Sequence, residues 1–411
     1  MESPAGRLDV TADDEQSILV LNVGSSTLKF GLFPIEEGDE PFLHGVLEYG
    51  GSAGGQFRVV DTRGAKSESR QVKADRGSAV PELLRYLDRT SQFGSVRAVG
   101  HRLVHGGSKL RDPVRIDARV RALLEEVVPL APDHLPTELG AIDDVSRFSP
   151  SMAQVACFDT AFHSEIPRVA RLFGLPRSLS ESGVVRYGFH GLSYEYVADI
   201  LGRHGDLPAR TIIAHLGSGA SITALRNGVS VDTSMGLTPT GGMVMSTRSG
   251  DLDPGVVLYL LRSAGLSADD VDDAVKRSGG LLGISGSSSD VRELLAASST
   301  DPRAEEAIAV FCYQAKKFIG AYAAVLGGID ALVFTGGIGE RSDVVRTRVC
   351  EGLGHLGLEL DAKLNRESAP TISAARSKVT VRTIRTNEEA MIARHTRSAI
   401  QGALGASKVP V

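Results

Sequence analysis

One arginine, Arg248, lies in a glycine- and hydroxyl-rich segment whose composition suits the binding of a planar anion. The segment, residues 232–254, reads DTSMGLTPTGGMVMSTRSGDLDP, and Asp251 and Asp253 follow the arginine closely. A guanidinium held in a loop presents N–H donors in a fixed plane, which matches carboxylate and phosphate oxygens. The same residues would also fit a solvated surface turn, so this segment alone leaves both interpretations open.

Two glycine turns elsewhere in the chain could bind phosphate. Residues 17–33 (SILVLNVGSSTLKFGLF) read as two strands joined by a glycine turn at Gly24, and residues 211–225 (TIIAHLGSGASITAL) repeat the design with Gly217. An ordinary hairpin would explain one such turn. A turn whose backbone amides face an anion explains its recurrence better. The repeat predicts two structurally similar halves that could bind one phosphorylated ligand.

Other chemically capable residues follow predicted strands. A third glycine turn, Gly336 to Glu340, follows residues 331–335 (ALVFT), where free amides at a helix start would suit a nucleotide. Asp159 follows the apolar strand 153–158, which is where α/β folds place chemistry. Helix capping by Asp159 is the alternative interpretation.

The elements that must position these residues alternate between strand and helix patterns. Strand patterns cover residues 42–49, 56–61, 98–104, 153–158, 331–335 and 378–384 besides the two hairpins, and helix patterns cover residues 80–90, 120–128, 136–148, 194–205, 253–264, 267–278, 290–297, 302–326, 343–354 and the final helix to about 396. Alternation of strand and helix patterns in the first half of the chain is typical of an α/β fold. The N-terminal acidic segment and the last residues are predicted to be loose tails.

Composition narrows the possible functions. The 411 residues suggest two domains, and a net charge of −5 with 5% aromatic residues gives no footprint for nucleic acid. The three cysteines suggest neither a disulfide framework nor a zinc site, which fits a reducing cytoplasm. No apolar run reaches membrane-spanning length, and no signal peptide pattern opens the chain, so a soluble cytoplasmic protein without a membrane partner is expected.

Phosphoryl transfer is the chemistry that best uses these parts. It requires positioning and charge neutralisation, which glycine turns, the two arginines Arg102 and Arg248, and carboxylates at strand ends can supply. The sequence contains no GxxxxGK[ST] loop and no protein-kinase motif set. A split, duplicated scaffold is therefore the expected one.

The chain resembles the acetate kinase family from about residue 17 to residue 397. The matching motifs are LNVGSSTLKFGLF, HRLVHGG, CFDTAFH, VRYGFHGLSYEYV, AHLGSGAS, DTSMGLTPTGGMVMSTRSGDLDP, FTGGIGERS and RTNEEAMIARHT. The family belongs to the superfamily of sugar kinases, Hsp70 and actin. The resemblance implies two similar α/β domains of the ribonuclease H-like type, each with a mixed five-stranded sheet flanked by helices, with the active-site cleft between them.

In this interpretation residues 1–160 with 386–411 form the acyl- and metal-side domain, and residues 161–385 form the nucleotide-binding domain. The resemblance also implies a homodimer that acts on small molecules. Its reaction would be the reversible, Mg²⁺-dependent conversion of ATP and acetate to ADP and acetyl phosphate, with Mn²⁺ as another usable metal.

The resemblance assigns roles to individual residues. Asn22 and Glu388 match the magnesium site, a donor pair that suits a hard cation. Asp159, His190, Arg248 and Arg102 match catalytic residues, and Arg102, Val104, His134, Phe189 and Pro239 match the acyl-substrate site. The nucleotide contacts match Lys29, His215, Leu216, Gly217, Ser218, Gly219, Asp290, Val291, Arg292, Gly337, Ile338, Gly339, Glu340 and Arg341.

Two of these roles have alternatives. Asp159 matches an essential acid or base, but a carboxylate substrate has no proton to lose at neutral pH, so orienting Arg102 or a metal-bound water is the role preferred here. His190, beside Phe189, could be a hydrogen-bonded core histidine, although the surrounding RYGFHG motif favours a catalytic one.

Several residues depart from the family pattern. Ser218 replaces an asparagine at the phosphate turn, and APDHLP replaces APLHNP, which introduces Asp133 and Leu135. An unpaired carboxylate beside a small apolar pocket would be costly and would repel a carboxylate substrate. Asp133 must therefore turn toward solvent or an arginine, or the pocket must accept another acid. Thr240-Gly241 and Arg341 also depart from the usual residues.

Three alternatives to an ATP-dependent acetate kinase remain open. A propionate or butyrate kinase is the nearest alternative, because one methylene changes binding by only about 1 to 3 kcal/mol. Pyrophosphate could replace ATP as the phosphoryl donor. An ATP-driven conformational module like actin or Hsp70 belongs to another class, and the pair Arg102 and Arg248 argues against it because a switch needs no carboxylate clamp.

Overall fold

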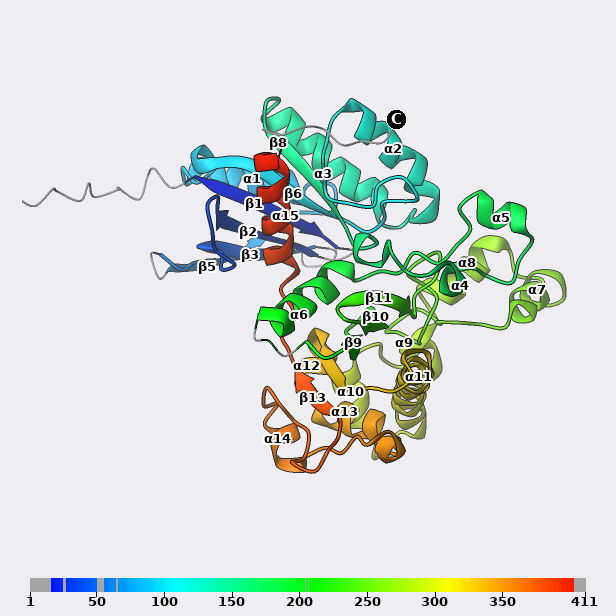
Figure 1. Ribbon diagram of the computed structural model, residues 1–411. Coiled ribbons are helices and arrows are strands. Elements are labelled where there is room, and N and C mark those ends of the chain that lie inside the picture. The colour runs from blue at the N-terminus through cyan, green and yellow to red at the C-terminus, as the bar shows by residue number, and fades with distance from the viewer. Residues whose placement is uncertain are drawn as a thin grey trace, which may run out of the picture. The chain divides into compact units, whose positions relative to one another are not determined.

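The computed structural model describes residues 16–24, 27–49, 55–63, 66–203, 205 and 207–402. The chain forms two compact units (Figure 1). Unit 1 comprises residues up to Phe158 and from Glu388 onward, and unit 2 runs from Asp159 to Asn387. Ser25 and Ser26 of the first predicted turn lie outside the described residues, as do most of the two predicted tails.

Unit 1 contains an eight-stranded mixed sheet in the order β5-β4-β3-β2-β1-β6-β8-β7. Its strands are β1 (Ser17–Val23), β2 (Thr27–Pro34), β3 (Leu43–Glu48), β4 (Gly55–Asp61), β5 (Lys66–Val72), β6 (Val96–Leu103), β7 (Val114–Arg115) and β8 (Ala153–Phe158). β1 is fully buried, as its unbroken apolar run predicts. It pairs antiparallel with β2 and parallel with β6.

The helices of unit 1 pack on this sheet. They are α1 (Ala79–Arg89), α2 (Ala118–Val127), α3 (Leu135–Phe148) and α15 (Glu388–Gly402), with short 3₁₀ turns η1 (Phe93–Ser95) and η2 (Val128–Leu130). The last helix, α15, packs on β1, β6 and β8. The approach is close at Gly100, because a Cβ there would collide with the Thr396 hydroxyl.

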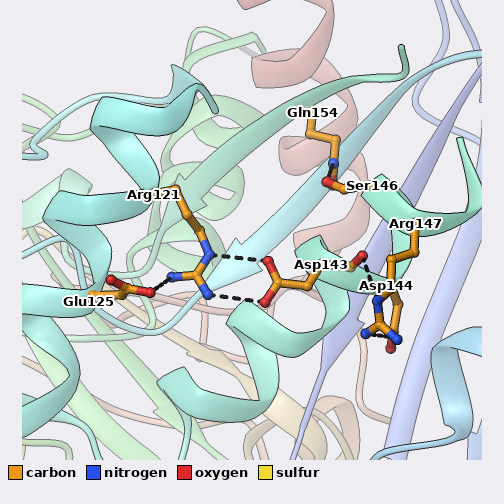
Figure 2. Close-up of polar contacts among 7 residues, drawn as sticks. All are labelled: Arg121, Glu125, Asp143, Asp144, Ser146, Arg147 and Gln154. Atoms are coloured by element: carbon orange, nitrogen blue, oxygen red, sulfur yellow. Dashed lines mark hydrogen bonds and ion pairs between the residues drawn. The ribbon is translucent and has the colours of Figure 1, made fainter. Parts of the chain in front are cut away.

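Ion pairs join α2 to α3 (Figure 2). Arg121 on α2 donates through Nε and Nη2 to the two carboxylate oxygens of Asp143 on α3, at 3.2 and 3.1 Å, and through Nη1 to Glu125 at 2.8 Å. Gln154 on β8 donates to Ser146 at 2.8 Å, which ties α3 to the sheet. These contacts hold the outer helices to the sheet that carries Arg102.

Unit 2 contains a five-stranded sheet in the order β11-β10-β9-β12-β13. Its strands are β9 (Arg210–Leu216), β10 (Ala220–Arg226), β11 (Val229–Thr233), β12 (Ala331–Thr335) and β13 (Thr380–Thr383). β9 pairs antiparallel with β10 and parallel with β12. This pattern repeats the β3-β2-β1-β6-β8 part of the first sheet, so the predicted duplication is confirmed at the level of strand topology.

The predicted α/β fold with two related sheets is confirmed, but the expected strand number of the first sheet is wrong. Three strands extend its five-stranded core: β4 and β5 form a hairpin beyond β3, and β7 pairs antiparallel with β8. β5 reads KSESRQV and is mostly exposed. A polar edge strand of this kind lacks the alternation of apolar residues that marks a strand, so the sequence pattern did not reveal β5.

The helices of unit 2 surround its sheet. They are η3 (Ala161–His163), α4 (Arg168–Arg171), α5 (Arg177–Glu181), α6 (Gly191–Arg203), α7 (Pro254–Arg262), α8 (Ala268–Lys276), α9 (Gly280–Ser285), α10 (Val291–Ala297), α11 (Pro302–Leu326), α12 (Gly336–Arg341), α13 (Asp343–Cys350), η4 (Leu353–Leu356) and α14 (Ala362–Arg366). The long helix α11 begins at the cap Asp301 and ends at the left-handed Gly327. Within the described part of the chain, no helix is both long and apolar enough to cross a bilayer.

Candidate active site

Unit 1 gathers polar side chains where β1 and β6 end and α15 begins. Asn22, near the end of β1, donates through Nδ2 to Glu388 Oε2 at 3.2 Å and to Glu389 Oε1 at 3.1 Å. Arg102, near the end of β6, lies 3.9 Å from Glu388 through its Nε, and the two side chains are only 14 and 15% exposed. The carboxyl ends of parallel strands meet at one sheet edge, which brings together residues 366 positions apart in sequence.

This cluster has the donor chemistry of a magnesium site. Asn22 donates to both glutamates through its amide nitrogen, so its carbonyl oxygen is the group that can face a cation. Mg²⁺ prefers oxygen ligands and keeps several waters, so one carboxylate and one amide oxygen suffice. Among the described residues no group of three or more His, Cys, Asp or Glu side chains could hold a metal. The residues thus fit a hydrated Mg²⁺ better than a fully protein-bound ion.

Lys29 lies next to this cluster in the sheet. It pairs with Asn22 in the register of β1 and β2, and its side chain is exposed. On the same unit Tyr49 donates to the Gly24 carbonyl at 2.5 Å, which fixes the described edge of the first glycine turn. A lysine at this place can reach a phosphate as a mobile point charge.

The APDHLP segment precedes and opens α3. His134 is the N-cap residue of α3 and is half-buried, whereas Leu135 is fully buried. The Asp133 side chain is exposed, and its backbone carbonyl accepts a hydrogen bond from Arg76 Nη2 at 2.6 Å. Of the alternatives that the sequence left open, the structure therefore favours an outward Asp133. Val104, the predicted apolar wall, is buried and its backbone N–H donates to Glu138 at 2.9 Å.

In unit 2 a strained turn carries His190. His190 has φ of +58°, a left-handed conformation that is uncommon outside glycine. The following residue, Gly191, donates its N–H to the Asp159 carbonyl at 2.8 Å, and a Cβ at Gly191 would collide with that carbonyl. Asp159 is fully buried, and Thr160 occupies the N-cap position of the 3₁₀ turn after it without a side-chain cap hydrogen bond.

A buried histidine, His163, stabilises the same turn through a hydrogen bond to its backbone. His163 forms hydrogen bonds at both ring nitrogens, with Ser230 Oγ at 2.9 Å and with the Phe189 carbonyl at 3.0 Å. Its complete burial lowers its pKa to about 4, so the ring is neutral near pH 7. Because Phe189 precedes His190, His163 holds the backbone that presents the candidate catalytic histidine.

Two serines fix the paired imidazoles of this unit. His190 Nδ1 lies 2.8 Å from Ser221 Oγ, and His215 Nδ1 lies 2.8 Å from Ser193 Oγ. The two rings stack with centroids 4.3 Å apart. His190 is thus a ring held in one orientation in an accessible turn, and the alternative of a fully enclosed core histidine does not describe it.

Arg248 reaches the second glycine turn. A Cβ at Gly219 would lie 3.2 Å from His190 Nε2 and 3.8 Å from Arg248 Nη1, so both groups meet at this glycine. Arg248 Nη1 donates to the Pro239 carbonyl at 3.1 Å. Met245 within the same loop is fully buried. The surface-turn interpretation of residues 232–254 is therefore wrong: the loop packs inward and presents a guanidinium beside the phosphate turn.

The remaining predicted nucleotide residues lie at two helix starts. Gly337 to Arg341 belong to α12, which begins directly after β12, and Gly336 has φ of +76°. Asp290 caps α10 by accepting from Arg292 N at 2.8 Å, and the two side chains also form an ion pair that lowers the Asp290 pKa. Arg292 is itself exposed. Asp290 and Arg292 thus form a helix cap and an ion pair at the start of α10.

The structure brings the predicted residues into groups within each unit. Asn22, Arg102 and Glu388 meet in unit 1, whereas His190, His215, Gly219 and Arg248 meet in unit 2. The sequence analysis missed the residues that hold these groups. They are Glu389, which shares Asn22 with Glu388, and the supporting residues Ser193, Tyr194 and Ser221. Glu389 could have been found as the second acidic residue at a helix start, but no sequence signal marks the hydroxyl groups.

The chain is similar to known proteins over most of its length. Residues 17–394 match the model of the Acetokinase family. An acetate kinase of Rhodopseudomonas palustris (strain TIE-1) is 45% identical over 390 residues, which cover 92% of this chain and 97% of that protein. An acetate kinase of Clostridium novyi (strain NT) is 41% identical over 398 residues, covering 93% and 98%.

Similar solved structures include acetate and propionate kinases. A propionate kinase from Francisella tularensis is 34% identical with a TM-score of 0.87 and covers 93% of this chain and 99% of its own. Porphyromonas gingivalis acetate kinase is 38% identical with a TM-score of 0.83, covering 94% and 100%. A family model spanning nearly the whole chain and relatives above 40% identity leave one conclusion: this chain belongs to the acetokinase family.

Proposed function

We propose that this protein is an acetate kinase, which transfers the γ-phosphoryl group of ATP to acetate and forms ADP and acetyl phosphate reversibly. The observation that carries the proposal is the meeting of His190 and Arg248 at Gly219. A phosphate-sized turn with an imidazole and a guanidinium beside it provides donors for the charge that develops on a transferring phosphoryl group. The family membership supports the acyl acceptor.

The transfer is a direct in-line displacement. A carboxylate oxygen of acetate attacks the γ-phosphorus while the bond to the β,γ-bridging oxygen breaks, and ADP leaves with that electron pair. Arg248 and His190 donate to the equatorial oxygens, which gain charge as the bonds change. Arg102 binds the acetate carboxylate, and Val104, His134, Phe189 and Pro239 line the acyl side.

The nucleotide and metal have assigned places in this proposal. The amides of the His215 to Gly219 turn and Lys29 bind the phosphates, while Asp290 to Arg292 and Gly337 to Arg341 bind the adenosine. Asn22 and Glu388 would hold Mg²⁺, or Mn²⁺ in its place, and the bound ion would neutralise phosphate charge. Glu389 accepts from the Asn22 amide nitrogen, so it fixes the side chain whose carbonyl oxygen would hold the metal.

Asp159 acts as a positioning residue in this proposal. The substrate carboxylate is already ionised near pH 7, so no general base is needed to activate it. The Asp159 carbonyl accepts from Gly191 N, which fixes the turn after His190. The role proposed for its carboxylate is to orient Arg102 or a metal-bound water.

A propionate kinase is the second candidate. One observation favours it: a propionate kinase is among the similar structures. One methylene changes binding by only about 1 to 3 kcal/mol, so a small change in the wall of the acyl site shifts the preferred acid.

Acyl phosphate formation tests the proposal. Purified protein with Mg²⁺ and ATP would be offered formate, acetate, propionate, butyrate or no acid, and acyl phosphate would be trapped with hydroxylamine. The highest kcat/KM is expected with acetate. A maximum with propionate or butyrate would favour the second candidate, activity with pyrophosphate alone would replace the phosphoryl donor, and ATP hydrolysis unaffected by any acid would favour a conformational ATPase.

Substitution of Asp133 tests the interpretation of the APDHLP segment. Because the Asp133 side chain is exposed and Arg76 contacts its backbone carbonyl, Asp133→Leu is expected to leave the KM for acetate within about twofold of the unchanged protein. The measurement is acetate saturation in the hydroxamate assay. A several-fold drop in KM would show that the carboxylate faces the acyl site and weakens acetate binding.

We also infer that the protein is a homodimer and that α7 lies in its interface. None of the nine residues of α7 is buried, although the helix reads PGVVLYLLR. Val256, Leu258, Tyr259 and Leu261 are 41, 46, 62 and 38% exposed. Apolar surface concentrated on one element marks a protein contact, and a second copy of the chain is the partner that the family resemblance implies. Figure 1 shows α7 projecting from unit 2.

A charge placed on α7 tests the dimer. The double substitution Leu258→Glu and Tyr259→Glu is expected to convert a dimer to a monomer in sedimentation equilibrium, because burying two carboxylates in an apolar interface is costly. Val60→Glu is the matched control, since Val60 is 39% exposed on β4 of unit 1. A monomeric parent protein, or a dimer that survives the double substitution, would exclude α7 as the interface.

A cytoplasmic location is also part of the proposal. Cys157, Cys312 and Cys350 are all buried and form no disulfide. Burial raises the pKa of Cys312 to about 11 and that of Cys350 to about 12, so neither is a reactive thiolate near pH 7. Unoxidised, inert thiols are typical of a reducing compartment.

A further inference from the structure

A chain of buried hydroxyl groups ends on the imidazole of His190. Tyr194 Oη lies 2.5 Å from Ser221 Oγ, and Ser221 Oγ lies 2.8 Å from His190 Nδ1. Tyr194 and Ser221 are both fully buried, so water cannot take part in these bonds. The opposite ring nitrogen, Nε2, is the one near the Gly219 turn. The hydroxyl chain and the phosphate turn therefore contact different nitrogens of the same ring.

The protons of this chain can be ordered by counting partners. Ser221 has one hydroxyl proton and two side-chain partners in the described part of the chain, Tyr194 and His190. If Ser221 donated to Tyr194, the Tyr194 hydroxyl proton would have no acceptor among the described residues. A buried hydroxyl group without an acceptor for its proton costs about 1 to 3 kcal/mol. If Tyr194 donates to Ser221, and Ser221 donates to Nδ1, every proton has an acceptor.

Tyr194 is suited to be the fixed donor of this chain. Burial raises its pKa far above the usual range, an effect larger than the opposing hydrogen bonds from Ser221 and the His215 backbone. The phenol therefore keeps its proton near neutral pH. A backbone group that donates to the phenol oxygen also directs the Tyr194 proton toward Ser221.

We propose that Tyr194 and Ser221 are positioning residues that hold neutral His190 as the tautomer protonated at Nε2. An imidazole of this form accepts at Nδ1 and presents an N–H donor at Nε2, beside the glycine turn. His190 then donates to a phosphoryl oxygen without first having to be protonated. The role of the donor rests on the proposed phosphoryl transfer, whereas the tautomer is a property of the protein itself.

Nitrogen-15 NMR of the histidine rings tests the tautomer without any assay of activity. Protein labelled at the imidazole nitrogens would be measured at about pH 8.5, where imidazoles are neutral, and His190→Gln would assign the signals. His190 is expected to show a protonated Nε2 and an unprotonated Nδ1. In Tyr194→Phe and in Ser221→Ala the shifts should move toward a mixture of both tautomers. A proton on Nδ1 in the parent protein would overturn the proposal.

Kinetics separates this positioning role from a merely structural one. Tyr194→Phe keeps the ring, which packs edge-on against His163 with centroids 5.5 Å apart, and removes only the hydroxyl. Its kcat is expected to fall roughly tenfold with the KM for ATP and acetate unchanged, a smaller loss than that for removing a group that touches phosphate. Ser221→Thr, which keeps the hydroxyl, should recover most of the loss seen in Ser221→Ala.

Tyr187→Phe is the matched control. Tyr187 is also a buried tyrosine of unit 2, and its hydroxyl donates to the Gly183 carbonyl at 3.1 Å. This variant should keep both kcat and the His190 signals. Equal losses in Tyr187→Phe and Tyr194→Phe would assign the effect to packing and overturn the positioning role. If the parent protein transfers no phosphoryl group but shows the expected tautomer, the proposed function fails and the tautomer stands.

Discussion

Replacement of Arg248 by alanine is expected to lower kcat at least about a thousandfold while the protein remains folded. The guanidinium lies beside Gly219 together with His190 Nε2. In the proposed mechanism its charge is directed at the place where the transferring phosphoryl group gains negative charge. Loss of a comparable arginine or oxyanion donor in other enzymes costs about 10² to 10⁵ in rate. Steady-state acetyl phosphate formation at saturating ATP and acetate would measure the change.

Two comparisons make the Arg248 result specific. Arg248→Lys keeps the charge but loses the planar donors, so it should recover only a small part of the rate. Arg203→Ala removes an exposed arginine on α6 that pairs with Asp199 at 2.9 Å, and kcat should not change. If Arg248→Ala kept more than about a tenth of the parent kcat with unchanged circular dichroism, Arg248 would not act on the transferring group.

The second large effect is expected at Arg346, and it concerns folding. Arg346 is fully buried between α13 and its neighbours. Its guanidinium donates to Asn365 Oδ1 at 2.7 Å, to the Asn365 carbonyl at 2.6 Å and to the Gly339 carbonyl at 2.9 Å. These hydrogen bonds hold α14 and the glycine turn of α12 to α13. Burial also lowers the Arg346 pKa, because the charged form is costly away from water.

Arg346→Met should lower the free energy of unfolding by about 3 kcal/mol. The substitution keeps an unbranched chain about as long as the arginine side chain up to Nε but removes the guanidinium, which leaves three buried acceptors without this donor, each worth about 1 to 3 kcal/mol. Removal of a buried charge offsets part of this loss. Urea unfolding followed by circular dichroism would measure the difference. Arg376→Met, at an exposed ion pair with Glu359, is the control and should cost far less; equal losses would show that burial of Arg346 contributes nothing.

The sequence predicted the strands that consist mainly of apolar residues, because such runs are usually buried. β1, β8 and β12 are short apolar runs, and all three are core strands. The repeated hairpin also predicted the shared topology of the two sheets, because the same order of apolar strand, glycine turn and apolar strand favours the same local pairing in both units. By contrast, the polar strand β5 and the two-residue strand β7 exist only through pairing with a neighbour, which no local pattern reports.

The candidate site was predictable in its residues but not in its support. Arg248, His190 and the 215–219 turn were identified by motif, and the structure places them together. Ser221 and Tyr194 were not, because their importance depends on hydrogen bonds across 27 and 31 positions of sequence. Arg346 was missed for a related reason: an arginine within an amphipathic segment is usually exposed, and only the tertiary fold buries it.

The placement of α15 bears on the order in which the protein can be made. Unit 2 is one continuous segment, whereas unit 1 needs the last helix to cover β1, β6 and β8 and to supply Glu388 beside Asn22. All of unit 2 must therefore be synthesised before α15 can cover the first sheet. Until α15 is synthesised, the face of the first sheet that includes Gly100 remains uncovered. Unit 2 can therefore fold before the first strands of unit 1 are packed against α15. A chain that stops before Glu388 would lack both this cover and the carboxylates of the proposed metal site.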